Sequence, residues 1–323
     1  MKRRHLLGAV ALAAAVPQSG HAQAFPERPI RFIVPYAPGG STDTSARIVS
    51  EKIAALLGQP VIVENKPGGG TIIGTEIVAK SKPDGHTILL TPAAMIAIAA
   101  FGMVVPYDID KDLVPVVGFV DLPILLAASN KAPFQTVAEL ITWSKAEPGR
   151  TVAYASAGVG SLTHLWGEYV KAKTGLPMEH VGYKGSAEAL RDVIAGHVPL
   201  FADVLVPTAA AVRAGQIRGL AVAMAQRSEL LPDVPTVAEA GLPGTEGTVP
   251  FGISVPGGTP ASVVMKLNTA FNEALGDPPI RRKLLELGFV PVGGAPQAYV
   301  AVLANEIAKW RKVIKESKIP APT

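Results

Sequence analysis

Short apolar runs that alternate with amphipathic stretches are the feature of this 323-residue sequence that most limits its fold. Runs such as 30–34, 61–64 and 87–91 have the length and composition of buried strands. The stretches 44–57 and 72–79 between them repeat apolar residues at helical spacing. This alternation is typical of parallel sheets covered by helices. We therefore predict an α/β fold with mostly parallel sheets.

The alternation occurs in two blocks, with one early and one late connection between them. The first connection is the apolar run 114–129, which is long enough for two strands or for one path that crosses between lobes. The second follows a Pro- and Gly-rich stretch, after which 251–255 is predicted as a strand that returns to the first block. Because open α/β sheets bind ligands beyond the carboxyl ends of their strands, we predict a ligand cleft between two lobes. Lobe 1 is expected to comprise 25–123 and 250–323, and lobe 2 to comprise 124–249.

The first 24 residues have the three parts of a secretory signal peptide. Residues 2–4, Lys-Arg-Arg, form a basic start, and 6–16 form an apolar stretch that is too short for a permanent membrane-spanning helix. Residues 22–24 offer an Ala-x-Ala cleavage pattern. We predict export to the periplasm with cleavage near Ala24, by either the general secretory or the twin-arginine route.

Removal of this leader leaves a nearly neutral chain. The leader holds three of the 30 Lys and Arg residues and none of the 26 Asp and Glu residues. No polybasic stretch remains, which argues against nucleic acid or anionic lipid as the main partner. The chain contains no Cys, so neither disulfides nor thiol chemistry are available to it.

Residues 34–43, Val-Pro-Tyr-Ala-Pro-Gly-Gly-Ser-Thr-Asp, have the pattern of a tight loop between a strand and a helix. The two glycines permit a sharp turn and a close approach to a ligand. The Ser-Thr-Asp that follows consists of residue types that begin helices, so free N–H groups and the positive end of the helix dipole would meet here. Such a point binds anions. The residues expected around the anion are Gly39, Gly40, Ser41, Thr42 and Asp43.

The second block offers a loop of the same kind. Residues 155–164, Ala-Ser-Ala-Gly-Val-Gly-Ser-Leu-Thr-His, again follow a predicted strand and open a predicted helix. Two facing helix N-termini with Ser and Thr hydroxyls can hold a carboxylate without an arginine. The residues expected to contact the ligand are Ser156, Ala157, Gly158, Gly160 and Ser161.

Ten short motifs, in this order and spacing, resemble those of the exported substrate-binding receptors of the tripartite tricarboxylate transporter family, the Bug-type receptors. They include Val63-Glu64-Asn65-Lys66-Pro67-Gly68 and His180-Val181-Gly182-Tyr183-Lys184-Gly185. The others are 29–31, 34–43, 57–61, 83–85, 106–108, 154–161, 231–236 and 258–260. Each motif alone is weak, but together they run through nearly the whole mature chain.

The resemblance implies a periplasmic-binding-protein fold, similar to type II, that closes over a small carboxylate. The ligands of such receptors include tricarboxylates, dicarboxylates, acidic amino acids and aromatic acids. The receptor would act as a monomer and deliver its ligand to membrane subunits of the transporter. It would need no cofactor, and ordered waters would share in holding the carboxylate. The resemblance adds these residues to the expected ligand-binding set: Tyr36, Tyr183, Lys184 and Asp203.

Several of these residues also have a structural interpretation. The serines of the second loop can simply cap a helix, and Asp43 can be a favourable charge at a helix start. Lys184 can be a solvated turn residue, and Asp203 can accept a backbone N–H. His164, one turn into its predicted helix, is expected to be a structural, hydrogen-bonding histidine.

Two other classes of protein remain as alternatives. A secreted α/β hydrolase is less favoured, because the sequence has no Gly-x-Ser-x-Gly elbow and no closely spaced His pair for a metal. A ligand-dependent sensor would have the same sequence features as a transport receptor. The chain also departs from the family pattern at Thr71, which interrupts a Gly-rich loop, and in the unusually apolar segment 91–105.

Overall fold

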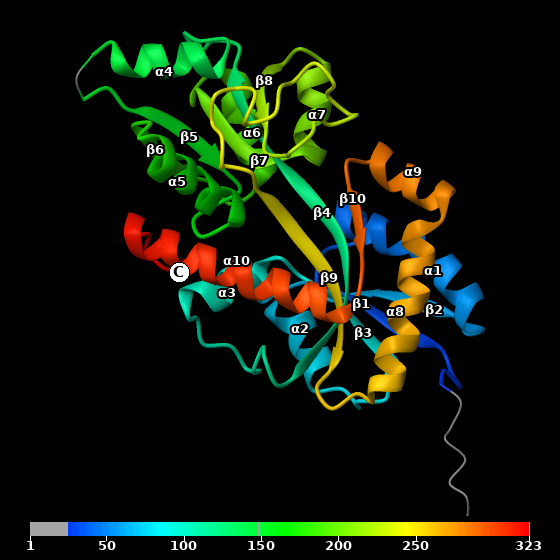
Figure 1. Ribbon diagram of the computed structural model, residues 1–323. Helices are drawn as coiled ribbons and strands as arrows, with labels where there is room; N and C mark the ends of the chain where they lie inside the picture. Colours follow the sequence, from blue (N-terminus) through cyan, green and yellow to red (C-terminus); the bar gives the residue numbers. More distant parts are fainter. Residues whose placement is uncertain (1–24, 148, 323) are drawn as a thin grey trace, which may run out of the picture.

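Two strands carry the chain between the two lobes of the molecule (Figure 1). β4 (Leu113–Ser129) runs from one lobe into the other, and β9 (Thr248–Pro256) pairs antiparallel with its first half. The structure is a computed structural model that describes residues 25–147 and 149–322. The predicted leader, 1–24, lies outside these described residues. The predicted two-lobed α/β fold is confirmed, but its sheets are mixed and not mostly parallel, because the crossover strands β4 and β9 pair antiparallel with their neighbours.

Lobe 1 contains a sheet with a parallel part and an antiparallel part. In sheet order its strands are β2 (Val61–Asn65), β1 (Ile30–Val34), β3 (Thr87–Thr91), β9, the first half of β4, and β10 (Val290–Gly293). The first three run parallel, whereas β9 and β10 pair antiparallel with their neighbours. The helices are α1 (Ser41–Leu57), α2 (Ile72–Ala79), α3 (Ala94–Phe101), α8 (Ala261–Gly276) and α9 (Pro278–Glu286).

Aromatic side chains join helix α8 to this sheet. The ring of Phe271 packs edge-on against Phe32 of β1 and Phe119 of β4, with centroids 6.0 and 6.3 Å apart. All three side chains are fully buried. This cluster holds the middle of β1, the strand from which the first predicted loop leaves.

Lobe 2 repeats the arrangement with its own strands and helices. β5 (Val152–Ser156) lies between β6 (Met178–Gly182) and β7 (Leu200–Val204), and all three are parallel. The second half of β4 runs antiparallel between β7 and β8 (Ile217–Val222). The helices are α4 (Val137–Lys145), α5 (Leu162–Thr174), α6 (Ser186–Ala195) and α7 (Leu205–Arg213).

The structure decides one alternative that the sequence left open, and it adds two elements that were not expected. The apolar run at 114–129 forms one continuous strand, the single-path alternative, because its pairing partner changes from β9 to β7 without a break in the strand. Helix α3 and strand β10 were not anticipated. Helix α3 is apolar on all sides and lacks the polar face that gives a helical period. No helix in the described part of the chain is long and apolar enough to cross a membrane.

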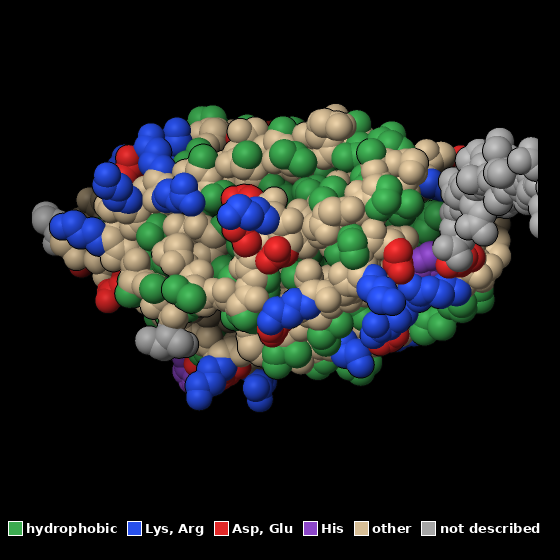
Figure 2. All heavy atoms as spheres, turned by 90° about the horizontal axis from the view of Figure 1, so that it is seen from below, with side chains coloured by type: hydrophobic (Ala, Val, Ile, Leu, Met, Phe, Trp, Pro, Cys, Tyr) green, Lys and Arg blue, Asp and Glu red, His purple; other side chains and the backbone are tan. Residues whose placement is uncertain are grey.

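The last helix, α10 (Pro296–Ser317), packs against β4 and α3 and also against α5 of lobe 2. Trp310 packs edge-on against Tyr169 of α5, with ring centroids 6.1 Å apart. Beyond the helix, Pro322 lies against Gly160. The division of the chain into lobes stays a prediction, and α10 adds a connection between them beside β4 and β9. The face seen in Figure 2 carries Lys and Arg side chains interspersed with Asp and Glu.

Candidate ligand-binding site

The first clamp loop, defined here as residues 39–43, joins β1 to α1. The helix begins at Ser41, three residues before the predicted start, so the hydroxyl residues lie in its first turn. Gly40 occupies the N-cap position and brings no capping side chain, and Gly39 has a φ of +80°. Gly39, Gly40 and Ser41 are exposed, whereas Thr42 is buried. The first-turn N–H groups therefore lack a side-chain cap, as an anion site requires.

Asp43 holds this loop in place. Its carboxylate accepts hydrogen bonds from the Gly39 N–H at 2.9 Å, from Arg47 Nε at 3.0 Å and from Asn65 Nδ2 at 3.0 Å. Burial of the side chain raises the pKa of Asp43, but these three donors outweigh it and hold the pKa below its ordinary value. The contacts support the structural interpretation of Asp43. They also bring Asn65 beside the loop, a residue that the sequence analysis named only as part of the motif 63–68.

The second clamp loop, residues 156–161, joins β5 to α5. Ser161 is the N-cap of α5: its hydroxyl accepts the His164 N–H at 3.2 Å and donates to the Gly158 carbonyl at 2.7 Å. Ser156 is buried, and its hydroxyl lies 2.7 Å from Nε2 of His180. Both serines thus have partners inside the protein, and the hydrogen bonds shape the loop. The expected structural role of His164 is confirmed, because its Nδ1 accepts the Gly160 N–H at 3.0 Å.

Strand register brings the other predicted residues of lobe 2 to the same edge. Ser156 pairs with Gly182, and Ala155 pairs with Phe201, so Ala157, Tyr183 and Asp203 follow at one level. The Tyr183 hydroxyl donates to Asp192 Oδ2 at 2.7 Å, and burial, with Asp192 beside it, raises its pKa to about 12. Lys184 is exposed at the next position.

Asp203 is a buried acidic residue near the carboxyl end of β7. Its side chain is 1% exposed, and Oδ1 accepts the Val204 N–H at 2.7 Å. Oδ2 has no hydrogen-bond partner within 25–147 and 149–322, and nearby Ser186 makes no bond of normal geometry with it. Burial raises the pKa of Asp203 to about 6, although Ser186 and the Val204 N–H partly offset the rise. A buried carboxyl oxygen without a partner is a candidate contact for a ligand group.

The two clamp loops emerge from edges that face each other across β4. In lobe 1 the carboxyl end of β3, Thr91, pairs with Gly252, which pairs in turn with Gly118 of β4. In lobe 2 Asp203, near the carboxyl end of β7, pairs with Leu125 of β4. β3 and β7 run in opposite senses along β4, so each sheet ends toward the other. The two pairing positions on β4 are separated by about 23 Å of extended strand.

Tyr36 lies at the lobe 1 edge. Its side chain is half-buried and packs edge-on against Phe251 of β9, with ring centroids 6.1 Å apart. Burial raises the pKa of the Tyr36 hydroxyl well above its ordinary value. The ring therefore borders the crossover strands between the two clamp loops.

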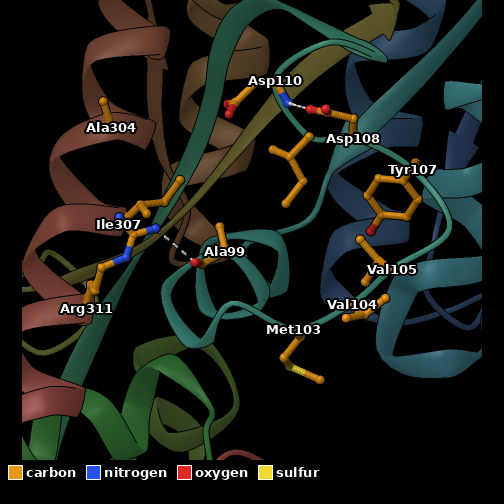
Figure 3. Close-up of a pocket in the computed structure, with 11 residues that line it drawn as sticks. Ala99, Met103, Val104, Val105, Tyr107, Asp108, Asp110, Ala304, Ile307 and Arg311 are labelled. Carbon is orange, nitrogen blue, oxygen red and sulfur yellow. Dashed lines mark hydrogen bonds between the residues drawn. The ribbon is translucent and has the colours of Figure 1, made fainter.

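A separate cavity of about 640 Å³ lies away from the clamp loops. It is formed by α3, the connection 103–110 and α10, and Arg311 donates to the Ala99 carbonyl at its rim, 3.2 Å apart (Figure 3). None of the residues predicted for ligand binding lines it. Residues 103–105 of this connection, including the exposed Val104, form the end of the segment 91–105 that departs from the family pattern.

Sequence reasoning missed His180 as part of the site. It lies on β6 directly beside Tyr154 of β5, two positions before the Ser156–Gly182 pair at which the clamp loop begins. A signal was available, because His180 opens the motif that also contains Tyr183.

The chain is similar to known proteins in both sequence and structure. The sequence matches the tripartite tricarboxylate transporter family receptor over residues 45–319. Protein BugT of Bordetella pertussis is 34% identical over 314 residues, which covers 97% of this chain and 96% of BugT. The structure of an R. palustris protein with adipate is 36% identical, with a TM-score of 0.78 over 93% of this chain and all of that one. MatC from Rhodopseudomonas palustris, with bound malate, is 32% identical, with a TM-score of 0.73 over 90% of this chain and all of MatC.

Proposed function

Because this chain belongs to the tripartite tricarboxylate transporter receptor family, we propose that it captures a small carboxylate between its clamp loops and delivers it to membrane subunits of such a transporter. Members of the family are solute-binding receptors. Among the carboxylate classes, dicarboxylates are the first candidates, because the two similar structures contain adipate and malate. We assign the chain no catalytic role.

The observation that carries this proposal is the facing arrangement of the two clamp loops. Each lies at the start of a helix and at the carboxyl edge of its parallel strands, and the two lie on opposite sides of the crossover strands β9 and β4. An anion that accepts hydrogen bonds from both helix starts would interact with both only when the lobes are close together. Such a ligand shifts the balance toward the closed form by its higher affinity for that form.

The remaining predicted residues supply contacts beyond the carboxylate. Tyr36 borders the cleft from lobe 1, and Lys184 offers an exposed positive charge near the second clamp loop. Asp203 offers the oxygen that has no partner in the described residues. A ligand hydroxyl, amine or protonated carboxyl group is the kind of donor that this oxygen accepts. These contacts would select among acids that share the same first carboxylate.

Export is part of the proposal. The leader at 1–24 would direct the chain to the periplasm and be removed near Ala24, leaving a receptor that acts as a monomer. N-terminal sequencing of the exported protein tests the cleavage site, and light scattering tests the monomer. A mature chain that retained residues 1–24, or a stable dimer, would contradict these two parts.

The test of function is ligand binding by protein that has been unfolded and refolded to remove bound acids. Thermal unfolding is measured with adipate, malate, citrate, aspartate and benzoate, and calorimetry follows for any acid that shifts the transition. A ligand present at about 100 times its Kd adds about 2.7 kcal/mol to the free energy of unfolding. If the bound acid is recovered from the protein with its mass unchanged, the protein acts as a receptor. Conversion of the acid to another compound would favour an enzyme.

Matched variants connect the binding to the clamp loops. Ser156→Ala combined with Ser161→Ala should weaken carboxylate binding, because both hydroxyls hold the second clamp loop. Ser144→Ala removes a buried serine whose hydroxyl donates to a helix carbonyl in α4, outside both loops, and should leave the affinity unchanged. Equal affinities for the double variant, the control and the wild type would remove these hydroxyls from the site.

A further inference from the structure

Two histidine rings lie stacked beside the second clamp loop. His164 belongs to the first turn of α5, and His180 belongs to β6. Their ring centroids are 3.7 Å apart and their planes differ by 18°. The stack joins the start of α5 to β6.

Each ring holds one end of the loop. Nε2 of His180 lies 2.7 Å from the hydroxyl of Ser156, where the loop begins. Nδ1 of His164 accepts the N–H of Gly160 at 3.0 Å, near the end of the loop. A ring nitrogen that accepts a hydrogen bond carries no proton, so this network assigns His164 as an uncharged ring with its proton on Nε2.

The surroundings keep both rings uncharged. His164 is 4% exposed, and burial, with smaller effects of His180 and Lys171, lowers its pKa to about 3. Burial likewise lowers the pKa of His180 to about 4. Tyr154 of β5 lies beside both rings, and its hydroxyl is 3.0 Å from Glu168, which in turn lies 3.5 Å from Lys171.

We propose that the stacked His164–His180 pair is a positioning element for ligand binding, which holds both ends of the second clamp loop in one shape while the rings are uncharged. This inference rests on the proposed function, because it assumes that the loop contacts the carboxylate. Protonation of His164 at Nδ1 would place two donors, the ring N–H and the Gly160 N–H, against each other. Two stacked cations would also repel.

The test compares two variants of His164 by calorimetry at about pH 7.5, with whichever of adipate and malate binds the wild type. His164→Ala removes the acceptor for Gly160 and the stack, so the Kd should rise about tenfold or more. His164→Asn places an amide oxygen near the position of Nδ1 but lacks the stacked ring, so its Kd should fall between those of the wild type and His164→Ala. His197→Asn makes the same substitution at an exposed histidine, outside the loop, and should leave the Kd unchanged.

A purely structural role for His164 would give a different pattern. The proposal is overturned if folded His164→Ala protein binds as the wild type does, or if His164→Asn loses as much affinity as His164→Ala. Unfolding in urea, measured on each variant, separates loss of affinity from loss of the fold.

The wild-type protein provides a second readout that needs no variant. Nitrogen NMR of the histidine rings should show Nδ1 of His164 without a proton from about pH 5 to pH 8, with the Gly160 amide signal moving only at lower pH, together with the ring. A protonated Nδ1 at neutral pH would overturn the inference. Failure of the wild type to bind any carboxylate would instead count against the proposed function, and the ring spectra would still decide how the pair is bonded.

Discussion

Pro322 of the C-terminal tail packs directly against Gly160 of the second clamp loop. A Cβ atom added to Gly160 would lie 2.6 Å from Cγ of Pro322, and Gly160 has a φ of +76°. The tail follows α10, which begins on lobe 1, so one continuous segment reaches from lobe 1 to the proposed ligand contact. Substitutions at this contact should therefore affect both stability and binding.

Gly160→Ala should destabilise the protein by about 2 kcal/mol, because it adds a close contact to an unfavourable backbone conformation. Gly215→Ala is the matched control: Gly215 has a φ of +67° but has open space around its added Cβ. The control should cost about 1 kcal/mol. Urea unfolding measures both, and Pro322→Gly should recover part of the loss in the Gly160→Ala background. Equal losses for the two alanine variants would show that the Pro322 contact contributes nothing.

Thr71→Gly should stabilise the protein by about 1 kcal/mol. Thr71 is a buried, β-branched residue with a φ of +85°, a conformation that glycine adopts without strain. Its hydroxyl also has no hydrogen-bond partner among the residues described. Thr71→Ala separates the two causes, because it removes the hydroxyl and keeps the strain. Thermal unfolding gives the ranking, and a Thr71→Gly protein less stable than the wild type would contradict the strain.

Asp43→Ala should cost about 2–3 kcal/mol and weaken ligand binding, because the first clamp loop loses the carboxylate that holds Gly39. Arg47→Gln removes the partly exposed ion pair but keeps the bond to Gly39, so it should cost under about 1 kcal/mol and leave the Kd unchanged. In the wild type, the pKa of Asp43 is held low, so its contribution to stability is present above its ordinary pKa and is lost as the pH falls through the lowered folded pKa. Urea unfolding and calorimetry of the two variants check these expectations.

Asp203→Asn should change stability in a pH-dependent way. The pKa of Asp203 is raised to about 6, so its ionised form disfavours folding at pH 8, and protonation removes this cost as the pH falls through 6. The asparagine variant should therefore be more stable than the wild type at pH 8, by about 2 kcal/mol, and no more stable near pH 4. Asp233→Asn, at an exposed position, should show no such difference. A constant difference across this pH range would mean that Asp203 stays ionised.

The strands and helices of this fold were largely predictable, because burial imposes a regular period on the sequence. Strands β1 and β3 and helix α2 have the predicted bounds. The start of α1 was misplaced because Ser41, Thr42 and Asp43 are good N-cap residues, yet Gly40 takes that position and the three form the first turn. Helix α3 gave no signal, because an apolar segment that is buried on all sides has no period to detect.

Contacts between distant segments could not be predicted in the same way. The sequence placed Tyr183 in the ligand-binding set, but it gave no indication that its hydroxyl would donate to Asp192. The stack of His164 on His180 depends on the pairing of β5 with β6, which a single sequence does not specify. Likewise, the contact of Pro322 with Gly160 depends on the path of α10, which runs from one lobe to the other.

The measurement that tests the central claim most directly is an amide NMR titration, in which a dicarboxylate that binds the protein is added to the ligand-free form. If both clamp loops hold one carboxylate, the signals of Gly39, Gly40, Gly158 and Gly160 should all shift and give one common Kd. Changes confined to a single loop would contradict the clamp. So would changes that map instead to the cavity between the connection 103–110 and Arg311 (Figure 3).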